Sequence, residues 1–305
     1  MNLSELKKPE PQPPIITIVG TPGVGKTSLG ALFPSPIFIQ AEEGSTVFDT
    51  WDEDVKPVMF PVLPRAKIKN QPEHKRVSTK DSILAQLRDL LTQDHEFKTL
   101  VIDSVTSLHA LFCHEVCEIY GTDNVADAAG GFHKGYLVVA EMHGEIKAAC
   151  DILRKKKGMT VIFLAHCGIK KMKNRPDADE YTVYTLDMHE ASIAQYTNLV
   201  DAVLYLRNEE FVTGQQSDRK GNITKFGRIM QTGQRVLVTS GDGRVGFVNA
   251  KNRYQLDAEI QVDEGENPLL DLIPYFVKRK KSETTEAKQE QAELNYTKSP
   301  NNCAN

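Results

Sequence analysis

The sequence lacks long hydrophobic runs. No stretch approaches the roughly 20 apolar residues that a helix needs to cross a bilayer. The segment from Met1 to Pro14 contains no apolar run either, and so does not resemble a secretory signal. We therefore expect no membrane association and a cytoplasmic location.

Paired cysteines and an excess of basic residues are also missing. The five cysteines are an odd number and show no C-x-x-C spacing, which favours reduced thiols. A formal net charge of −4 gives no overall basic signature, so any contact with nucleic acid must come from a local patch. The 305 residues, 40% of them hydrophobic, suffice for a full core.

Composition divides the chain into three parts. Residues 1–13 are polar and rich in proline, which predicts an extended segment. Residues 14–276 carry the pattern of a folded domain, in which 44–80 has four prolines and no clear periodicity and is interpreted as an irregular insertion. Residues 277–305 have low hydrophobicity and many charges, which predicts a disordered tail.

Buried-type strands alternate with amphipathic helices over the first two thirds of the domain. This alternation predicts an α/β fold around a mostly parallel sheet. Short strands with alternating polarity then predict an antiparallel C-terminal β extension. The expected strands are 15–19, 36–40, 99–102, 159–165 and 202–206, the expected helices are 27–33, 81–93, 105–120, 134–157 and 190–199, and the extension comprises 209–213, 226–230, 235–239, 244–250 and 258–262.

A glycine-rich loop follows the first strand and matches the pattern GxxxxGK[ST]. Glycines let backbone N–H groups surround a phosphate, Lys26 reaches the outer phosphates, and the hydroxyl of Thr27 can bind Mg²⁺. The alternative, an ordinary glycine-rich turn, does not explain the strand before it and the helix after it. The predicted residues for binding ATP are Gly20, Thr21, Pro22, Gly23, Val24, Gly25, Lys26, Thr27, Ser28 and Asp103.

Acidic residues follow two of the other predicted strands. Asp103 ends the strand LVID, where a carboxylate can hold Mg²⁺ beside the phosphates together with Thr27. Many P-loop ATPases carry a water-activating Glu directly after this Asp, but Ser104 stands here. Glu42, at the end of the strand PIFIQ, is therefore the leading candidate for the catalytic acid. Glu43 is its competitor, and a capping or solvated acid is the alternative interpretation of Glu42.

His166 follows the buried strand VIFLA at the same predicted edge of the sheet. There a polar side chain could detect the terminal phosphate and transmit that state to the next loop. The alternative is a histidine whose hydrogen bonds serve the fold alone.

These motifs resemble the RecA-like recombinase group, and within it the small phage ATPases of the single-strand annealing and recombination class. The resemblance covers residues 14–275 and is carried by GTPGVGKT, FIQAE, LVIDS and VIFLAH with the basic loop after it. Its C-terminal part is VNAKNR, in which Lys251 and Arg253 match the position of basic residues that reach a neighbouring subunit's nucleotide. Two departures are His166, where recombinases commonly carry Gln, and the insertion at 44–80.

The resemblance implies a RecA-like P-loop NTPase that uses ATP and Mg²⁺, assembles into a ring or filament and acts on single-stranded DNA. Cations supplied by a neighbouring subunit would stabilise charge on the transferred phosphoryl group and make hydrolysis depend on assembly. The alternative for Lys251 and Arg253 is a pair of solvated strand charges. A single-strand-binding protein is a further expected partner, and the host cytoplasm is the expected location if a phage encodes the chain.

Two segments are candidates for contacts with DNA. The run from Gly168 to Arg175 has four cations that could neutralise phosphates, although a charge run is often only a solvated surface. The glycine-rich segment 128–136 offers Phe132 and Tyr136 for stacking on bases. The four cations are Lys170, Lys171, Lys173 and Arg175.

His109, Cys113 and Cys117 share one helical face and suggest a metal site. We reject it because a fourth ligand from a second element is missing and the surrounding residues have the character of a core.

The sequence thus predicts a DNA-stimulated ATPase of phage or prophage recombination or replication. Alternatives are a DNA-annealing module that uses ATP as an assembly switch with little turnover, and a helicase-related or loader ATPase. A small-molecule kinase is disfavoured because no lid or acceptor motif is evident in the sequence.

Overall fold

The computed structural model describes residues 11–172, 180–217, 223–240 and 250–282. Two compact units are present, one formed by Pro13–Asn267 and one that contains, among the described residues, 11–12 and 268–282. The unit Pro13–Asn267 carries the sheet and all of the P-loop residues.

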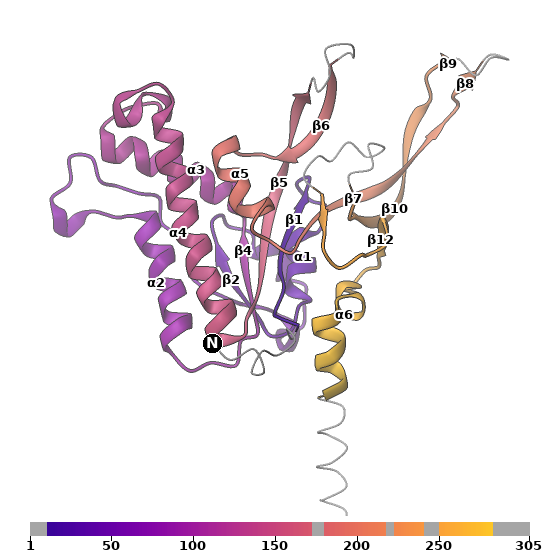
Figure 1. Ribbon diagram of the computed structural model, residues 1–305, viewed down its shortest axis with the longest axis horizontal. Helices are drawn as coiled ribbons and strands as arrows, with labels where there is room; N and C mark the ends of the chain where they lie inside the picture. Colours follow the sequence, from indigo (N-terminus) through magenta and orange to yellow (C-terminus); the bar gives the residue numbers. More distant parts are fainter. Residues whose placement is uncertain (1–10, 173–179, 218–222, 241–249, 283–305) are drawn as a thin grey trace, which may run out of the picture. The chain divides into compact units, whose positions relative to one another are not determined.

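A mixed sheet forms the centre of the larger unit (Figure 1). Within the described residues it has ten strands, in the order β12-β10-β7-β1-β5-β4-β2-β3, with β11 paired to β7 and β6 to β5. The strands from β7 to β3 are parallel to one another, whereas β10, β11 and β12 are antiparallel additions. The bounds are β1 Ile15–Gly20, β2 Pro36–Gln40, β3 Val58–Met59, β4 Thr99–Asp103, β5 Thr160–Met172, β6 Tyr181–Leu186, β7 Ala202–Thr213, β10 Arg228–Val238, β11 Lys251–Asn252 and β12 Glu259–Val262.

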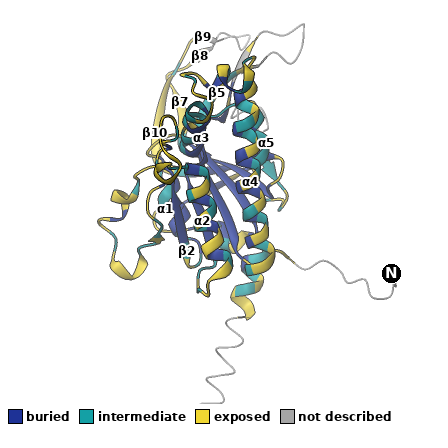
Figure 2. Ribbon diagram, turned by 90° about the vertical axis from the view of Figure 1, so that its left-hand side faces the viewer, coloured by how far each residue is buried: buried dark blue, intermediate teal, exposed yellow. Residues whose placement is uncertain are grey.

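Helices cover both faces of this sheet. The helices α2 to α5 lie on one face, where alternate strand residues such as Ile102 and Phe163 join their apolar sides in one core (Figures 1 and 2). Residues of opposite orientation face α1, whose Gly30 lies against Val101 and Leu164. The bounds are α1 Lys26–Ala31, α2 Thr79–Thr92, α3 Val105–Tyr120, α4 Lys134–Lys157 and α5 Glu190–Thr197. The predicted fold class, a mostly parallel α/β sheet with an antiparallel extension, is confirmed.

Local signals in the sequence set the ends of these helices. The Ser78 side chain caps α2 by accepting from the Asp81 N–H, and the Ser104 side chain caps α3 by accepting from Ser107. Gly121 and Gly158 end α3 and α4 in the left-handed conformation, which glycine adopts without steric cost. The predicted ranges 105–120 and 134–157 coincide with α3 and α4.

Two predictions about strands were wrong. The segment after Gly168 is not a loop, because β5 continues to Met172 and pairs with β6, a strand we did not predict. The segments 202–206 and 209–213 are one strand, β7, and much of 226–239 is one strand, β10. The strand pairs β5–β6 and β7–β10 therefore extend beyond the core and are held together by cross-strand pairing. In these outer parts the alternation of polar and apolar residues no longer reports which side chains are buried.

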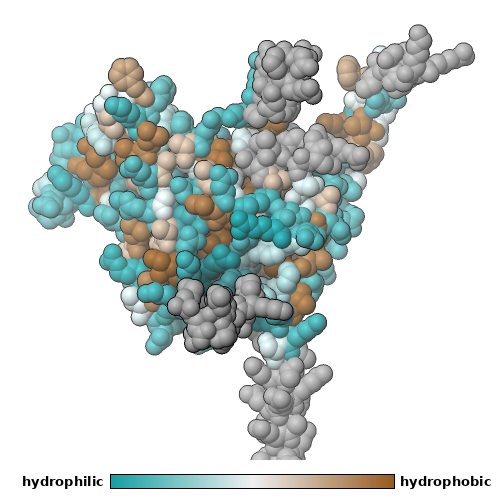
Figure 3. Space-filling view, viewed as in Figure 1, coloured by the Kyte–Doolittle hydropathy of each residue, from teal (hydrophilic) through white to brown (hydrophobic). Residues whose placement is uncertain are grey.

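The paired outer halves of β7 and β10 form a projecting arm, which continues to β8 (Gln216–Ser217) and β9 (Ile223–Lys225) (Figure 1). Several large apolar side chains are exposed on it, and Figure 3 shows hydrophobic surface there. They are Phe211, Val212, Phe226, Ile229 and Met230. The predicted strand 244–250 lies almost wholly outside the described residues.

The part of the segment 44–80 that precedes α2 contains only short elements. Three are 3₁₀ turns, η2 Ser45–Phe48, η3 Glu53–Val55 and η4 Glu73–Lys75, and one is β3, which extends the sheet beside β2. Leu63 and Ala66 are nevertheless buried, so the segment packs on the domain.

The unit from Pro268 onward begins with α6 (Leu269–Leu272). Residues 274–282 are helical, although we expected a disordered tail from 277, and Lys280 forms an ion pair with Asp271. The Lys-rich composition that predicted disorder also has good helix propensity. The rest of the predicted tail lies outside the described residues. None of the described helices combines the length and the apolar character that crossing a membrane requires.

Candidate nucleotide-binding site

The carboxyl ends of four parallel strands meet at one edge of the sheet. The register aligns Gly20 with His166, Leu164 with Asp103, and Asp103 with Gln40. The P-loop therefore lies next to Glu42, which follows β2, to Asp103 at the end of β4, and to His166 within β5. They line a pocket of about 280 Å³ that includes Lys26, Thr27, Glu42, Asp103 and His166.

The P-loop curls around its own lysine. Gly23 and Gly25 adopt positive φ values of 76° and 93°, which favour glycine. Lys26 Nζ donates to the carbonyl oxygens of Gly20 at 3.0 Å and Thr21 at 2.9 Å, and the residue is only 6% exposed. Burial lowers the pKa of Lys26, and the nearby Asp103 and Glu42 oppose this shift. The ammonium is thus held inside the loop, where an anionic ligand would become a further partner beside these carbonyl oxygens.

Thr27 and Asp103 place two oxygens where a Mg²⁺ ion fits. Thr27 Oγ1 donates to Asp103 Oδ2 at 2.6 Å. This separation lets both oxygens approach one small cation, and hydroxyl and carboxylate are ligands that Mg²⁺ prefers. Burial raises the pKa of Asp103, which a bound cation would reverse. Among the described residues no cluster of three His, Cys, Asp or Glu side chains suits a metal, so the ion would need phosphate and water as further ligands.

Glu42 lies beside these groups as an ionised acceptor. Its Oε1 accepts from His166 Nε2 and from Ser104 Oγ, both at 3.1 Å. The bond from His166 and a further one from Ser107 lower the pKa of Glu42 to about 2, although partial burial opposes the shift. The carboxylate is 42% exposed and lines the pocket. Glu43 lines the same pocket, so geometry leaves both acids within reach of a bound nucleotide.

His166 lies between Lys26 and Glu42 and contacts both. Its Nδ1 lies 3.4 Å from Lys26 Nζ, and its Nε2 lies 3.1 Å from Glu42 Oε1. Because a lysine ammonium can only donate, Nδ1 accepts and Nε2 carries the proton given to Glu42. The ring therefore contacts Lys26 and Glu42 at once, and its role as a sensor of the terminal phosphate stays a prediction.

Three hydroxyl residues of the site did not enter the predicted set. Ser104 both caps α3 and holds Glu42, Ser107 contributes to the low pKa of Glu42, and Thr106 Oγ1 accepts from the backbone N–H of His166 at 3.1 Å. The helix-start pattern after LVID was the available signal, because a capping serine at that position lies at the same edge as the P-loop.

Lys251 and Arg253 lie away from this pocket. They are on and just after β11, which pairs with the first residues of β7, whereas the P-loop follows the last residue of β1. Lys251 Nζ donates to the Thr197 and Asn198 carbonyls, and Arg253 forms an ion pair with Asp201. They cannot serve the nucleotide of their own chain from there, and a role in a neighbouring subunit stays a prediction.

The predicted DNA contacts are only partly described. Lys170 and Lys171 lie on β5 beyond the core, and Lys170 forms an ion pair with Glu190. Phe132 is 92% exposed, whereas Tyr136 is stacked on His189 at 4.0 Å between ring centroids. Lys173 and Arg175 lie outside the described residues. Phe132 is thus available for contacts, while Tyr136 already has an aromatic partner.

The helical face of His109, Cys113 and Cys117 was considered above as a metal site and rejected. His109 instead contacts His143, Nδ1 to Nε2 at 3.1 Å, and its Nε2 accepts from the His189 N–H.

A family model described as an AAA domain matches residues 12–254. No curated protein gives a significant match. The matched stretch spans most of the chain and includes the P-loop, Glu42, Asp103 and His166. This family is broader than the phage recombination ATPases, so the match does not test the resemblance to them. The chain belongs to the AAA domain family and carries a nucleotide-binding domain of the P-loop ATPase type.

Proposed function

We propose that this protein hydrolyses ATP with Mg²⁺ as a RecA-like ATPase, and that it acts on single-stranded DNA in phage or prophage recombination or replication. The observation that supports the DNA role is the path of β5. One strand carries His166 at the pocket and then Lys170 and Lys171 on the β5–β6 hairpin (Figure 1). A structural change at the bound nucleotide can therefore be transmitted along β5 from His166 to Lys170 and Lys171.

The residues of the pocket divide the chemistry of hydrolysis. Water attacks the γ-phosphorus while the bond from that phosphorus to the oxygen of ADP breaks, and the proton of the water passes to solvent. Thr27 and Asp103 would hold Mg²⁺, which would supply positive charge beside the phosphates. Lys26 positions the outer phosphates. Glu42, with a pKa of about 2, orients the water as a hydrogen-bond acceptor and is a weak base until its bond with His166 is broken.

Lys251 and Arg253 support a proposal about assembly. In a ring or filament, the sheet edge that carries them would face the nucleotide of the next copy, and their cations would stabilise the transition state there. Arg253 would have to exchange Asp201 for that phosphate. Hydrolysis would then depend on protein concentration as well as on DNA.

Turnover measured with and without single-stranded DNA tests the DNA role. We expect DNA to raise ATP turnover at low salt, and the double variant Lys170→Gln/Lys171→Gln to lose the stimulation while it keeps basal turnover. The matched control is Lys155→Gln/Lys156→Gln, which removes two exposed cations at the end of α4. The DNA role is contradicted if DNA changes neither turnover nor oligomeric state at low salt.

A second candidate is an ATP-switched DNA-annealing module with little turnover. The hydrogen bonds that Glu42 Oε1 accepts from Ser104 and His166 favour it, because they occupy the carboxylate oxygen that would otherwise act on water. ATP-dependent annealing of complementary strands, with turnover that stays slow at saturating DNA, would select this function over a DNA-stimulated ATPase.

A further inference from the structure

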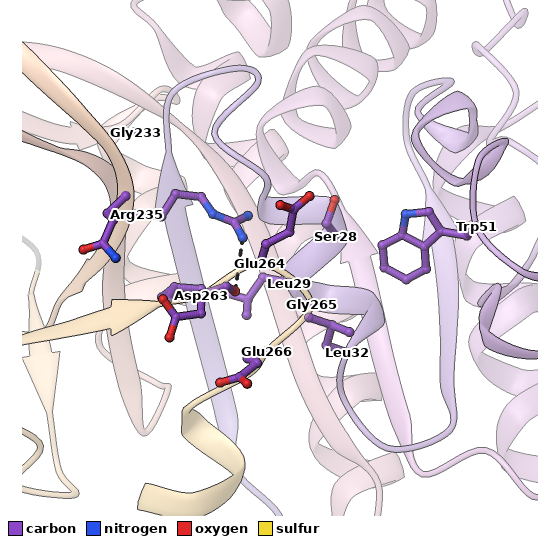
Figure 4. Close-up of a pocket in the computed structure, with 12 residues that line it drawn as sticks. Ser28, Leu29, Leu32, Trp51, Gly233, Arg235, Asp263, Glu264, Gly265 and Glu266 are labelled. Carbon is purple, nitrogen blue, oxygen red and sulfur yellow. Dashed lines mark hydrogen bonds between the residues drawn. The ribbon is translucent and has the colours of Figure 1, made fainter.

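A second cavity opens beside the P-loop pocket. It measures about 440 Å³ and lies between α1, the segment around Trp51 and the turn after β12 (Figure 4). Ser28 lines both this cavity and the P-loop pocket, so one elongated ligand could occupy both. Its volume lies within the range of roughly 300–1,000 Å³ that small-molecule sites occupy.

The charges around this cavity are unequal. Arg235 of β10 borders the P-loop, since a methyl group on Gly25 would overlap its Nη1, and its Nη2 donates to the Asp263 carbonyl at 3.3 Å. The turn after β12 contributes the acids Asp263, Glu264 and Glu266. Carboxylates repel phosphate, so the body of the cavity suits an uncharged group that donates hydrogen bonds. Only the border with Arg235 and Ser28 suits an anion.

The opposite wall presents an aromatic surface. Trp51 is the only tryptophan of the sequence, and its ring packs edge-to-face on buried Phe48 at 5.0 Å between centroids. This contact fixes the indole before a ligand arrives. Leu29 and Leu32 of α1 add apolar surface beside it. A planar heteroaromatic ring is the ligand group that such a wall binds best, through stacking.

We propose that this cavity holds the nucleoside part of a purine ribonucleotide whose phosphates lie in the P-loop. Trp51 stacks on the base, Glu264 accepts a hydrogen bond from a ribose hydroxyl, and Arg235 faces the α-phosphate above Ser28. Figure 4 shows the Glu264 carboxylate and the Arg235 guanidinium both directed toward Ser28. The inference rests on the proposed binding of ATP. It adds residues after position 254, beyond the stretch that the family model matches.

The single tryptophan makes the cavity observable by itself. In the full chain with Mg²⁺, we expect ADP to change the emission of Trp51 in a saturable way. Inorganic tripolyphosphate has no nucleoside, so it should bind the P-loop and compete with ADP without that change in emission. Calorimetry on the same samples gives the two affinities independently of fluorescence and of hydrolysis.

Two variants test the contact with the base and the contact with the ribose separately. Trp51→Ala should weaken ADP binding about tenfold by loss of stacking and leave the affinity for tripolyphosphate unchanged. Glu264→Ala should reduce the preference for ADP over 2′-deoxyADP or 3′-deoxyADP several-fold. Glu73→Ala, an exposed acid of η4, is the matched control and should change neither property.

The outcomes distinguish this inference from the proposed function. If ADP and tripolyphosphate bind equally well and Trp51 emission stays constant, the nucleoside lies elsewhere and the inference is wrong while phosphate binding stands. If neither ligand binds in the presence of Mg²⁺, the proposed ATPase function fails first. If Trp51→Ala unfolds the protein, Trp51→Phe takes its place and should retain most of the ADP affinity. A loss of ADP affinity in Trp51→Phe would also contradict stacking.

Discussion

The P-loop pocket and the buried histidine chain, which we define as His109, His143 and Tyr196, both place polar side chains against the same sheet. In the pocket, Lys26, Glu42 and Asp103 line open space. In the histidine chain, His109 contacts His143, and His143 Nδ1 lies 2.7 Å from the Tyr196 hydroxyl. The pocket has polar groups that a ligand can bind, whereas the polar groups of the histidine chain form their hydrogen bonds within the protein.

The direction of the bonds explains this difference. The backbone N–H of His189 donates to His109 Nε2, so His109 carries its proton on Nδ1 and donates to His143. His143 in turn donates from Nδ1 to the Tyr196 oxygen. Each ring is neutral, and burial lowers the pKa of both histidines. Substitutions should therefore separate function from stability, with effects on ligand binding in the pocket and on folding in the histidine chain.

The largest effect is expected for Lys26→Ala. Removal of the only ammonium inside the P-loop should lower ATP turnover about a thousandfold or more, because charge on the outer phosphates loses its main protein partner. Stability should change little or rise, since a buried cation is removed. Turnover and thermal unfolding, measured on one preparation, check this. A loss of activity that merely follows a large fall in Tm would contradict it.

His143→Ala should have the opposite profile. The ring is fully buried and packs on Phe112 and Tyr196, so its loss leaves a cavity and two unpaired polar groups. We expect the free energy of unfolding to fall by about 3 kcal/mol. Affinity for ADP should stay within about twofold of the parent, because the residue does not line the pocket. Denaturant unfolding and calorimetry measure the two quantities, with exposed His74→Ala as the control.

Acid should destabilise the fold through the same histidines. Burial lowers the pKa of His109 from 6.5 to about 4, so the unfolded state binds more protons between these values and stability falls as pH falls through this window. His109 alone should cost about 2 kcal/mol between pH 7 and pH 5. Above pH 7 this contribution should be constant. The variant His109→Gln should flatten the pH dependence of unfolding, and an unchanged slope would show that other groups cause it.

Much of the fold follows from local sequence. Ser78, Gly121 and Gly158 mark helix ends, and the apolar runs before Gly20 and at Leu100–Asp103 mark the central strands. Parallel pairing then brings the residues after these strands to one edge, which is why Glu42, Asp103 and His166 could be selected before the structure was known. Their roles in catalysis remain predictions.

Other features depend on pairing between distant segments. The extension of β5 and the arm of β7 and β10 are stabilised by strand partners. The pattern within 168–172 therefore did not reveal a strand, and the pattern within 202–213 predicted two strands where the structure has one. The second cavity joins Ser28, Trp51 and Arg235 with the turn after β12. No local pattern connects residues so far apart in the sequence.

A comparison of Glu42→Gln with Glu43→Gln tests most directly the claim that the pocket catalyses ATP hydrolysis. Both acids line the pocket, and Glu42 is the one that is hydrogen-bonded to Ser104 and His166. Single-turnover hydrolysis of ATP should slow about a hundredfold or more in Glu42→Gln, with ATP affinity retained, and change less than about threefold in Glu43→Gln. Unimpaired hydrolysis by Glu42→Gln would contradict the assignment of this site.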